Sequence, residues 1–135
     1  MNIFFTGSIR GGRAHQPKYA LIVKALERHG TVYSQHVQDE ALSQYGETGL
    51  SGREILERER GALGKCDIVV AEVTTPSLGV GYLIACATSL RKKVIALYFG
   101  GDALKLSAII KGDPGVELHT YKTDEDIEKI LGEVL

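Results

Sequence analysis

The chain has 135 residues, of which 44% are hydrophobic and 24% are charged, the composition expected of an ordinary soluble globular protein. Sixteen Lys and Arg residues against 17 Asp and Glu residues give a formal net charge of −1, so no global positive field favours binding to nucleic acid or to an anionic membrane. Cys66 and Cys86 form no CxxC motif, which predicts two buried thiols in a reduced, cytoplasmic protein rather than a zinc site or a disulfide. We expect one domain over residues 1–135, with no signal peptide and no membrane-spanning segment.

Apolar runs alternate with helical patterns along the whole chain. In chain order, the expected elements are a strand at 3–5, a helix from about 17 to 29, a strand at 31–34, an irregular loop at 38–50, a helix at 51–65, a strand at 67–73, a helix ending near 90, a strand at 94–99, a short helix at 104–110, an edge strand at 117–121 and a last helix from 123. This alternation predicts a doubly wound, flavodoxin- or Rossmann-like three-layer α/β fold with a parallel sheet of about five strands. Ligands of such sheets bind at the carboxyl ends of the strands.

The loop after the first strand has the composition of a phosphate-binding turn. It contains Ser8, Arg10, Gly11 and Gly12, which supply a hydroxyl, a guanidinium and exposed backbone N–H groups. It matches neither a Walker A loop nor a GxGxxG fingerprint, so the usual nucleotide motifs do not apply. The same residues also suit a plain turn with a solvated arginine, and spacing does not separate the two interpretations.

A second loop at the same edge leads from the most apolar strand into a helix. Ser77 is placed to cap that helix, and Gly79 follows it. The free N–H groups and the dipole of a helix N-terminus attract an anion. The alternative is that Ser77 only caps the helix and the glycine only permits close packing. Two such loops at one edge favour a phosphorylated small molecule as the ligand.

Among the carboxylates, Glu59 shares the apolar face of its helix with Ile55 and Leu63, whereas Arg58 is expected to point elsewhere. A carboxylate on an inward face is costly unless it is paired or used, which suggests general acid–base chemistry. The alternative is a Glu at the edge of the face, with its head in water. Glu72, near the end of a buried strand, is a second candidate. His36 follows the second strand at the ligand edge.

Two long motifs carry a specific resemblance. Gly7-Ser-Ile-Arg-Gly-Gly-Arg13 and Asp67-Ile-Val-Val-Ala-Glu-Val-Thr-Thr-Pro-Ser-Leu-Gly-Val-Gly-Tyr82 closely resemble the 2′-deoxynucleoside 5′-monophosphate N-glycosidases, within the nucleoside 2-deoxyribosyltransferase superfamily. The resemblance implies a flavodoxin-like homodimer that hydrolyses the N-glycosidic bond to a free base and deoxyribose 5-phosphate, with no metal or organic cofactor. It further implies a nucleoside 5′-monophosphate as the partner, bound by Ser8, Ile9, Arg10, Gly11, Gly12, His36, Ser77 and Gly79, with Ser107 reaching the phosphate from the partner subunit. The related transferases of unphosphorylated nucleosides carry an Asp at the position of Ser77.

Two positions depart from the pattern of the family that the chain resembles. The family nucleophile, a Glu directly after Gly-Val-Gly-Tyr82, is replaced by Leu83, and the family's second acid, an Asp, aligns with the longer Glu59. A Leu cannot attack C1′, so double displacement through this position is excluded. Three interpretations stay open: Glu59 or another acid activates water for direct attack, the protein is a nucleotide-binding regulator without catalysis, or a shifted helix register brings in another carboxylate.

Overall fold

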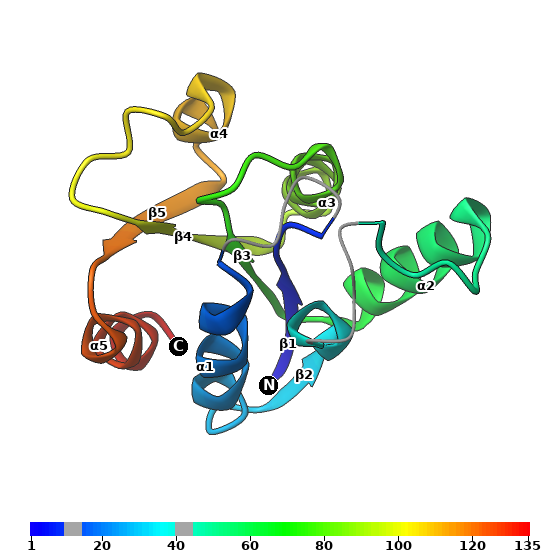
Figure 1. Ribbon diagram of the computed structural model, residues 1–135, viewed down its shortest axis with the longest axis horizontal. Helices are drawn as coiled ribbons and strands as arrows, with labels where there is room; N and C mark the ends of the chain where they lie inside the picture. The colour runs from blue at the N-terminus through cyan, green and yellow to red at the C-terminus, as the bar shows by residue number, and fades with distance from the viewer. Residues whose placement is uncertain (10–14, 40–44) are drawn as a thin grey trace.

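The computed structural model describes residues 1–9, 15–39 and 45–135, and within these residues it contains one parallel sheet of five strands (Figure 1). The strands are β1 (Asn2–Thr6), β2 (Thr31–Tyr33), β3 (Ile68–Glu72), β4 (Lys93–Phe99) and β5 (Val116–Tyr121). Their order in the sheet is β2-β1-β3-β4-β5, and each neighbouring pair runs parallel. This is the flavodoxin-like order, in which the chain direction across the sheet switches between β1 and β3. The predicted fold class is therefore confirmed.

Helices cover both faces of this sheet. They are α1 (Gln16–Leu26), α2 (Gly52–Lys65), α3 (Leu78–Ser89), α4 (Ala108–Gly112) and α5 (Asp124–Val134), and a 3₁₀ turn, η1 (Gln35–Gln38), follows β2. Helices α1 and α5 lie against one face, and α3 and α4 lie on the other (Figure 1). Successive strand residues point to opposite faces, so Phe5 packs toward α1 while Phe4 packs toward α3. The two apolar layers hold the central strands in place and fix their carboxyl ends at one edge.

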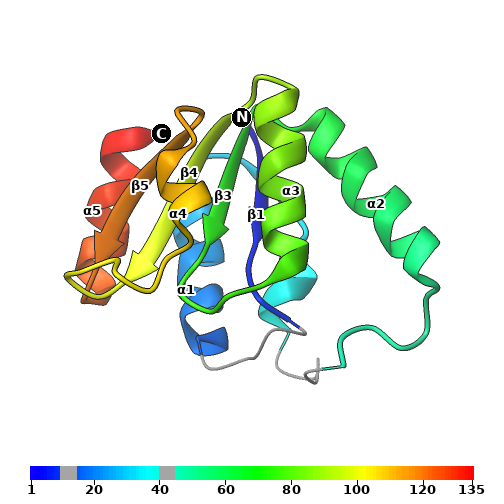
Figure 2. The same cartoon turned by 90° about the horizontal axis from the view of Figure 1, so that it is seen from above.

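Helix α2 is attached less extensively than the other long helices. It begins with the predicted capping box, in which the Ser51 N–H donates to Glu54 Oε2 at 2.7 Å and the Glu54 N–H donates to Ser51 Oγ at 3.2 Å. Only Glu59 and Leu63 of its 14 residues are buried. Figure 2 shows α2 beside the sheet, inclined away from α3. The helix that carries the candidate acid thus forms one outer wall of the molecule.

The structure corrects two of the sequence predictions. The short helix expected at 104–110 is instead a turn in which the Leu106 N–H donates to the Ala103 carbonyl, and α4 starts only after Ser107. Cys66 is buried and donates its Sγ–H to the Leu63 carbonyl, but Cys86 is only partly buried, at the margin of the apolar layer that contains α3. In the described part of the chain, no helix combines the length and the apolar character needed to cross a membrane.

Candidate active site

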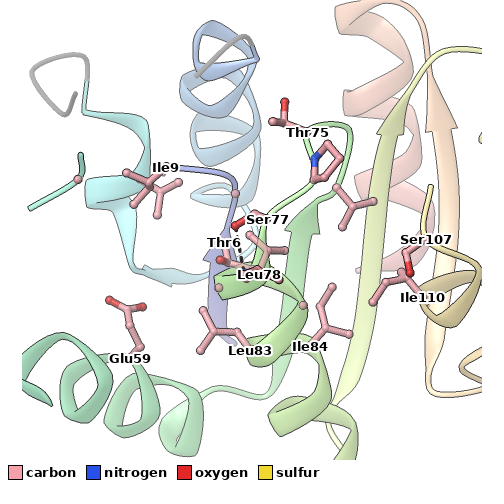
Figure 3. Close-up of a pocket in the computed structure, with 18 of the residues that line it drawn as sticks. Thr6, Ile9, Glu59, Thr75, Ser77, Leu78, Leu83, Ile84, Ser107 and Ile110 are labelled. Carbon is pink, nitrogen blue, oxygen red and sulfur yellow. Dashed lines mark hydrogen bonds between the residues drawn. The ribbon is translucent and has the colours of Figure 1, made fainter. Parts of the chain in front are cut away.

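A cavity of about 930 Å³ opens at the carboxyl ends of β1 and β3, between α2, α3 and the segment that leads into α4 (Figure 3). Thr6 and Gly7 line it from β1, and Val73 and Thr75 line it from the end of β3. This is the position at which doubly wound sheets bind their ligands, because the strand order reverses there. The volume lies at the upper end of the range for small-molecule sites and accommodates a nucleotide.

The N-terminus of α3 forms one wall of this cavity. Ser77 is the N-cap, and its Oγ accepts a hydrogen bond from the Val80 N–H at 3.3 Å. Ser77, Leu78 and Gly79 all line the cavity. The first turn of a helix leaves backbone N–H groups without partners inside the helix and carries the positive end of its dipole. This wall therefore suits a phosphate, as the sequence predicted.

Ser107 and Lys105 line the same cavity from the segment before α4. Both residues are exposed, and in Figure 3 Ser107 lies on the opposite side of the pocket from Glu59. Ser107 therefore offers a hydroxyl to the cavity of its own chain. Lys105 adds a cation that the sequence analysis did not single out.

Glu59 occupies the other end of the cavity, on α2. Its side chain is buried, and its carboxylate is held by donors on both oxygens. Ser34 Oγ donates to Oε2 at 2.7 Å, while Arg58 donates to Oε1 from Nε at 2.8 Å and from Nη2 at 2.6 Å. Ser34 has a left-handed backbone, with φ of 65°, which is a costly conformation for a residue other than glycine. The local fold thus places the Glu59 carboxylate in the cavity wall, with hydrogen-bond donors on both of its oxygens.

Arg58 links this carboxylate to two further residues of the cavity wall. Its Nη1 and Nη2 donate to the two oxygens of Glu47 at 2.7 and 2.6 Å, and its Nη2 lies 3.0 Å from His36 Nε2. Burial lowers the pKa of His36, and Arg58 lowers it further, while Glu59 and Glu47 act in the opposite direction. The two hydrogens of Arg58 Nη2 are directed at Glu59 and Glu47, so His36 Nε2 completes the cluster as a close neighbour of the guanidinium. The expectation that Arg58 points away from Glu59 was wrong, because its long side chain folds back along the helix.

The middle of the cavity is apolar. Leu83 of α3 lines it, and Figure 3 shows Leu83 between Glu59 and the neighbouring Ile84. Among the described residues that line the cavity, the carboxylates are Glu47 and Glu59. The position after Tyr82 thus faces the cavity as Leu83, and none of the carboxylates in the described ranges takes its place there.

The structure brings most of the predicted binding residues to this cavity. Ile9, His36, Ser77, Gly79 and Ser107 line it. Ser8 does not; it is fully buried, and its Oγ has no hydrogen-bond partner in the described part of the chain. Arg10, Gly11 and Gly12 lie outside the described residues.

Glu72 is separated from the cavity. Its carboxylate accepts hydrogen bonds from Thr74 Oγ1 and from the Tyr121 hydroxyl, the latter at 3.2 Å. Tyr121 belongs to the apolar layer on the α1 and α5 side of the sheet, so Glu72 faces away from α3. Burial raises the pKa of Glu72 to about 7. The second candidate acid is therefore a structural group of the opposite layer.

Glu47, Arg58 and Lys105 are the charged residues of the described cavity lining that sequence reasoning missed. Glu47 comes from a stretch with no periodic pattern, and nothing in its local sequence places it near α2. The adjacency of Arg58 and Glu59 was visible, but neighbours on a helix normally diverge by about 100°. The hydrogen bonds between the Arg58 and Glu59 side chains are therefore evident only from the structure.

Comparison with known proteins gives consistent results. The profile of the nucleoside 2-deoxyribosyltransferase family matches residues 3–124. The 5-hydroxymethyl-dUMP N-hydrolase of Danio rerio is 42% identical over 136 residues, covering 98% of this chain and 94% of the relative, and that of Mus musculus is 44% identical over 133 residues, covering 96% and 77%. A solved structure of the Clostridium botulinum CMP N-glycosidase BcmB has a TM-score of 0.67 at 20% identity, covering 98% of this chain and 99% of that one, which supports the fold.

Proposed function

Because the chain belongs to the nucleoside 2-deoxyribosyltransferase family, we propose that it hydrolyses the N-glycosidic bond of (deoxy)nucleoside 5′-monophosphates to a free base and (deoxy)ribose 5-phosphate. The observation that carries the proposal is a single cavity with the N-terminus of α3 at one wall and the Glu59 carboxylate at another. The first wall suits a 5′-phosphate, and the apolar middle suits the sugar and the base. The scissile bond then lies toward Glu59.

The reaction proceeds as a single displacement, because Leu83 provides no nucleophile. The oxygen of a water molecule bonds to C1′ while the C1′–N bond breaks, and the electron pair of that bond leaves with the base. Glu59 accepts the proton of the attacking water, and the base takes up a proton from solvent. Ser77 and Gly79, with Arg10, Gly11 and Gly12 of the first loop, anchor the phosphate, and Ile9 and His36 contact the rest of the nucleotide; the buried Ser8 stays behind the cavity wall.

The test of the reaction is a panel of deoxyribonucleoside and ribonucleoside 5′-monophosphates, with the matching unphosphorylated nucleosides, assayed for free base while calorimetry follows binding. We expect release from monophosphates only, and a loss of kcat of about 100-fold or more in Glu59→Gln. Glu57→Gln is the matched control, because Glu57 is exposed on the same helix. Unchanged release in Glu59→Gln would remove Glu59 from the mechanism.

The phosphate wall has its own test at Ser77. Ser77→Asp places a negative charge beside the phosphate dianion, so we expect nucleotide affinity to fall by about 100-fold. Ser77→Asn is the control, because Asn caps a helix as well as Asp does but carries no charge. Equal affinities in the two variants, measured by calorimetry, would refute the assignment of the phosphate to this wall.

Leu83 favours a second candidate function, a nucleotide-binding regulator without catalysis. The two functions are separated by Leu83→Glu, which supplies the carboxylate that a glycosyl-enzyme intermediate needs. We expect a higher rate of base release in this variant if the remaining scaffold is catalytically competent. Tight nucleotide binding without release, in both the wild type and Leu83→Glu, would instead establish the regulator.

We also propose that the protein acts as a cytoplasmic homodimer, with residues 1–135 as one domain. Leu78, Leu104 and Ile109 are 96%, 78% and 82% exposed, and all three lie close to the cavity mouth or the segment around Ser107. Exposed apolar side chains of this size are typical of an interface. In such a dimer the exposed Ser107 of one subunit reaches the phosphate bound by the other.

A further inference from the structure

Arg58 is the most highly connected polar side chain of the cavity wall, with contacts to Glu59, Glu47 and His36. We propose that Arg58 is a positioning residue that holds the Glu59 carboxylate in one orientation, aimed into the cavity at the water that attacks C1′. This inference rests on the proposed function for its catalytic consequence, although its effect on Glu59 can be measured without turnover.

The first support is the geometry at Glu59. Two N–H groups of Arg58 converge on Oε1 at 2.8 and 2.6 Å, and Ser34 Oγ donates to Oε2 at 2.7 Å. Charge-assisted hydrogen bonds of this length favour the ionised carboxylate, because a protonated carboxyl group accepts such bonds more weakly. Donors on both oxygens also fix the plane of the carboxylate. Oε2 retains a lone pair for a water proton.

The second support is the way in which Arg58 is itself held. Glu47 binds its guanidinium through both oxygens, and His36 Nε2 lies 3.0 Å from the nitrogen that also contacts Glu59. These carboxylates raise the pKa of Arg58, and Arg58 lowers the pKa of Glu47. The side chain is only about one-third exposed, so this pairing is more persistent than a surface ion pair. Arg58 therefore has one defined orientation, with its charge directed at Glu59.

The third support is the absence of a nucleophilic carboxylate at position 83, where the cavity wall has a leucine. With a leucine at this position, the reaction depends on a water molecule whose proton needs an acceptor. Within the described residues, the charged or titratable groups that face Glu59 are Arg58 from its own helix, His36 from the segment after β2 and Glu47 from the loop before α2. Of these, Arg58 is the cation in direct contact, so its removal most disturbs the position of the Glu59 carboxylate.

The test compares Arg58→Gln and Arg58→Lys with wild type. The matched control is Arg53→Gln, because Arg53 is exposed on the same helix and pairs only with Glu57 on the surface. The carboxyl ¹³C resonance of Glu59, assigned by its absence in Glu59→Gln, is recorded at pH 7 in each protein. We expect this resonance to shift and broaden in Arg58→Gln, because the carboxylate loses two N–H donors and its fixed plane, with Arg58→Lys in between and Arg53→Gln unchanged.

A parallel measurement connects this effect to turnover. We expect kcat for base release to fall by about 10-fold or more in Arg58→Gln while KM changes little, and Arg58→Lys to restore part of the difference. If wild type releases no base, the proposed reaction fails, while the ¹³C measurement still decides the role of Arg58. A Glu59 resonance in Arg58→Gln that matches the wild-type resonance would overturn the positioning role; if that variant fails to fold, the same comparison is made with Arg58→Lys.

Discussion

Two buried glutamates show how surroundings assign different roles to one residue type. Glu59 meets a cation and a hydroxyl at the cavity, so its negative charge is compensated. Glu72 meets the hydroxyl groups of Thr74 and Tyr121 but no cation among the described residues, and its Oε2 has no hydrogen-bond partner there. Burial without a cation favours the neutral acid, which is why the pKa of Glu72 rises to about 7. The two glutamates thus differ in whether a cation compensates their buried carboxyl group.

This difference predicts how stability depends on pH. A carboxyl whose pKa is higher in the folded state than in the unfolded state binds its proton more tightly when folded. The contribution of Glu72 to stability is therefore fully present below about pH 4.5 and is lost as the pH rises to about 7. We expect Glu72→Gln to remove this loss. Relative to wild type, the free energy of unfolding of the variant should therefore be higher at pH 8 than at pH 4, by at most about 3 kcal/mol.

Urea unfolding of both proteins at pH 4 and pH 8 measures the effect. Glu57→Gln provides the control for general changes in charge, since Glu57 is exposed on α2. A difference between wild type and Glu72→Gln that is the same at both pH values would contradict the prediction.

The sequence predicted those individual site residues whose signals are local and missed those whose contacts join distant parts of the chain. Ser77 and Glu59 were found because capping and helical periodicity are local patterns. Glu47 was missed because its contact with Arg58 joins a loop without periodicity to a helix face. The location of Glu72 was ambiguous, since a strand buried on both faces gives no alternation that assigns a side chain to one layer.

Among the elements, the connection from α1 to β2 is the tightest. The Met1 carbonyl accepts a hydrogen bond from the Thr31 N–H at 2.9 Å, which draws the chain start against the residue before β2. A Cβ at Gly30 would lie 2.0 Å from the Met1 oxygen. The glycine therefore permits a backbone approach that no other residue allows.

We accordingly expect Gly30→Ala to destabilise the protein by more than about 1 kcal/mol, since the backbone must move and the pairing of β1 with β2 must loosen. Gly61→Ala is the contrasting variant, because Gly61 is exposed in α2 with open space around it. There the alanine should stabilise by about 0.5–1 kcal/mol. Thermal unfolding of both variants tests the prediction. It fails if the Tm of Gly30→Ala is equal to or higher than that of wild type.

The elements themselves were predicted well where their signals were local. Capping boxes marked the starts of α2 and α5, and both are present with reciprocal hydrogen bonds. The boundary of α4 was missed because Leu104 and Leu106 fit a helical pattern while the backbone forms a turn before Ser107. A helix of five residues has too few positions for periodicity to locate its first turn.

For the molecule as a whole, alternation of strands and helices was enough to predict the fold, because parallel strands require helical crossovers. The arrangement of subunits has no such local signal. The proposed homodimer predicts that Ile109→Glu, which charges an apolar side chain that is 82% exposed, shifts the protein toward monomer. Lys24→Glu on α1, on the other side of the sheet, should leave the assembly unchanged.

Sedimentation velocity over a range of concentrations reads out this prediction. A wild-type protein that sediments as a monomer at all concentrations would refute the homodimer. A dimer that Ile109→Glu does not weaken would place the interface elsewhere.

The sparse attachment of α2 has a consequence for the molecule in solution. With only Glu59 and Leu63 buried, this helix is held by a few contacts, whereas β1, β3 and β4 are enclosed between two layers. Backbone amides of α2 should therefore exchange with deuterium through local opening, long before those of the central strands. A nucleotide that bridges α3 and Glu59 would slow this exchange. The slower exchange of the α2 amides would then measure how strongly the ligand stabilises the helix that carries Glu59.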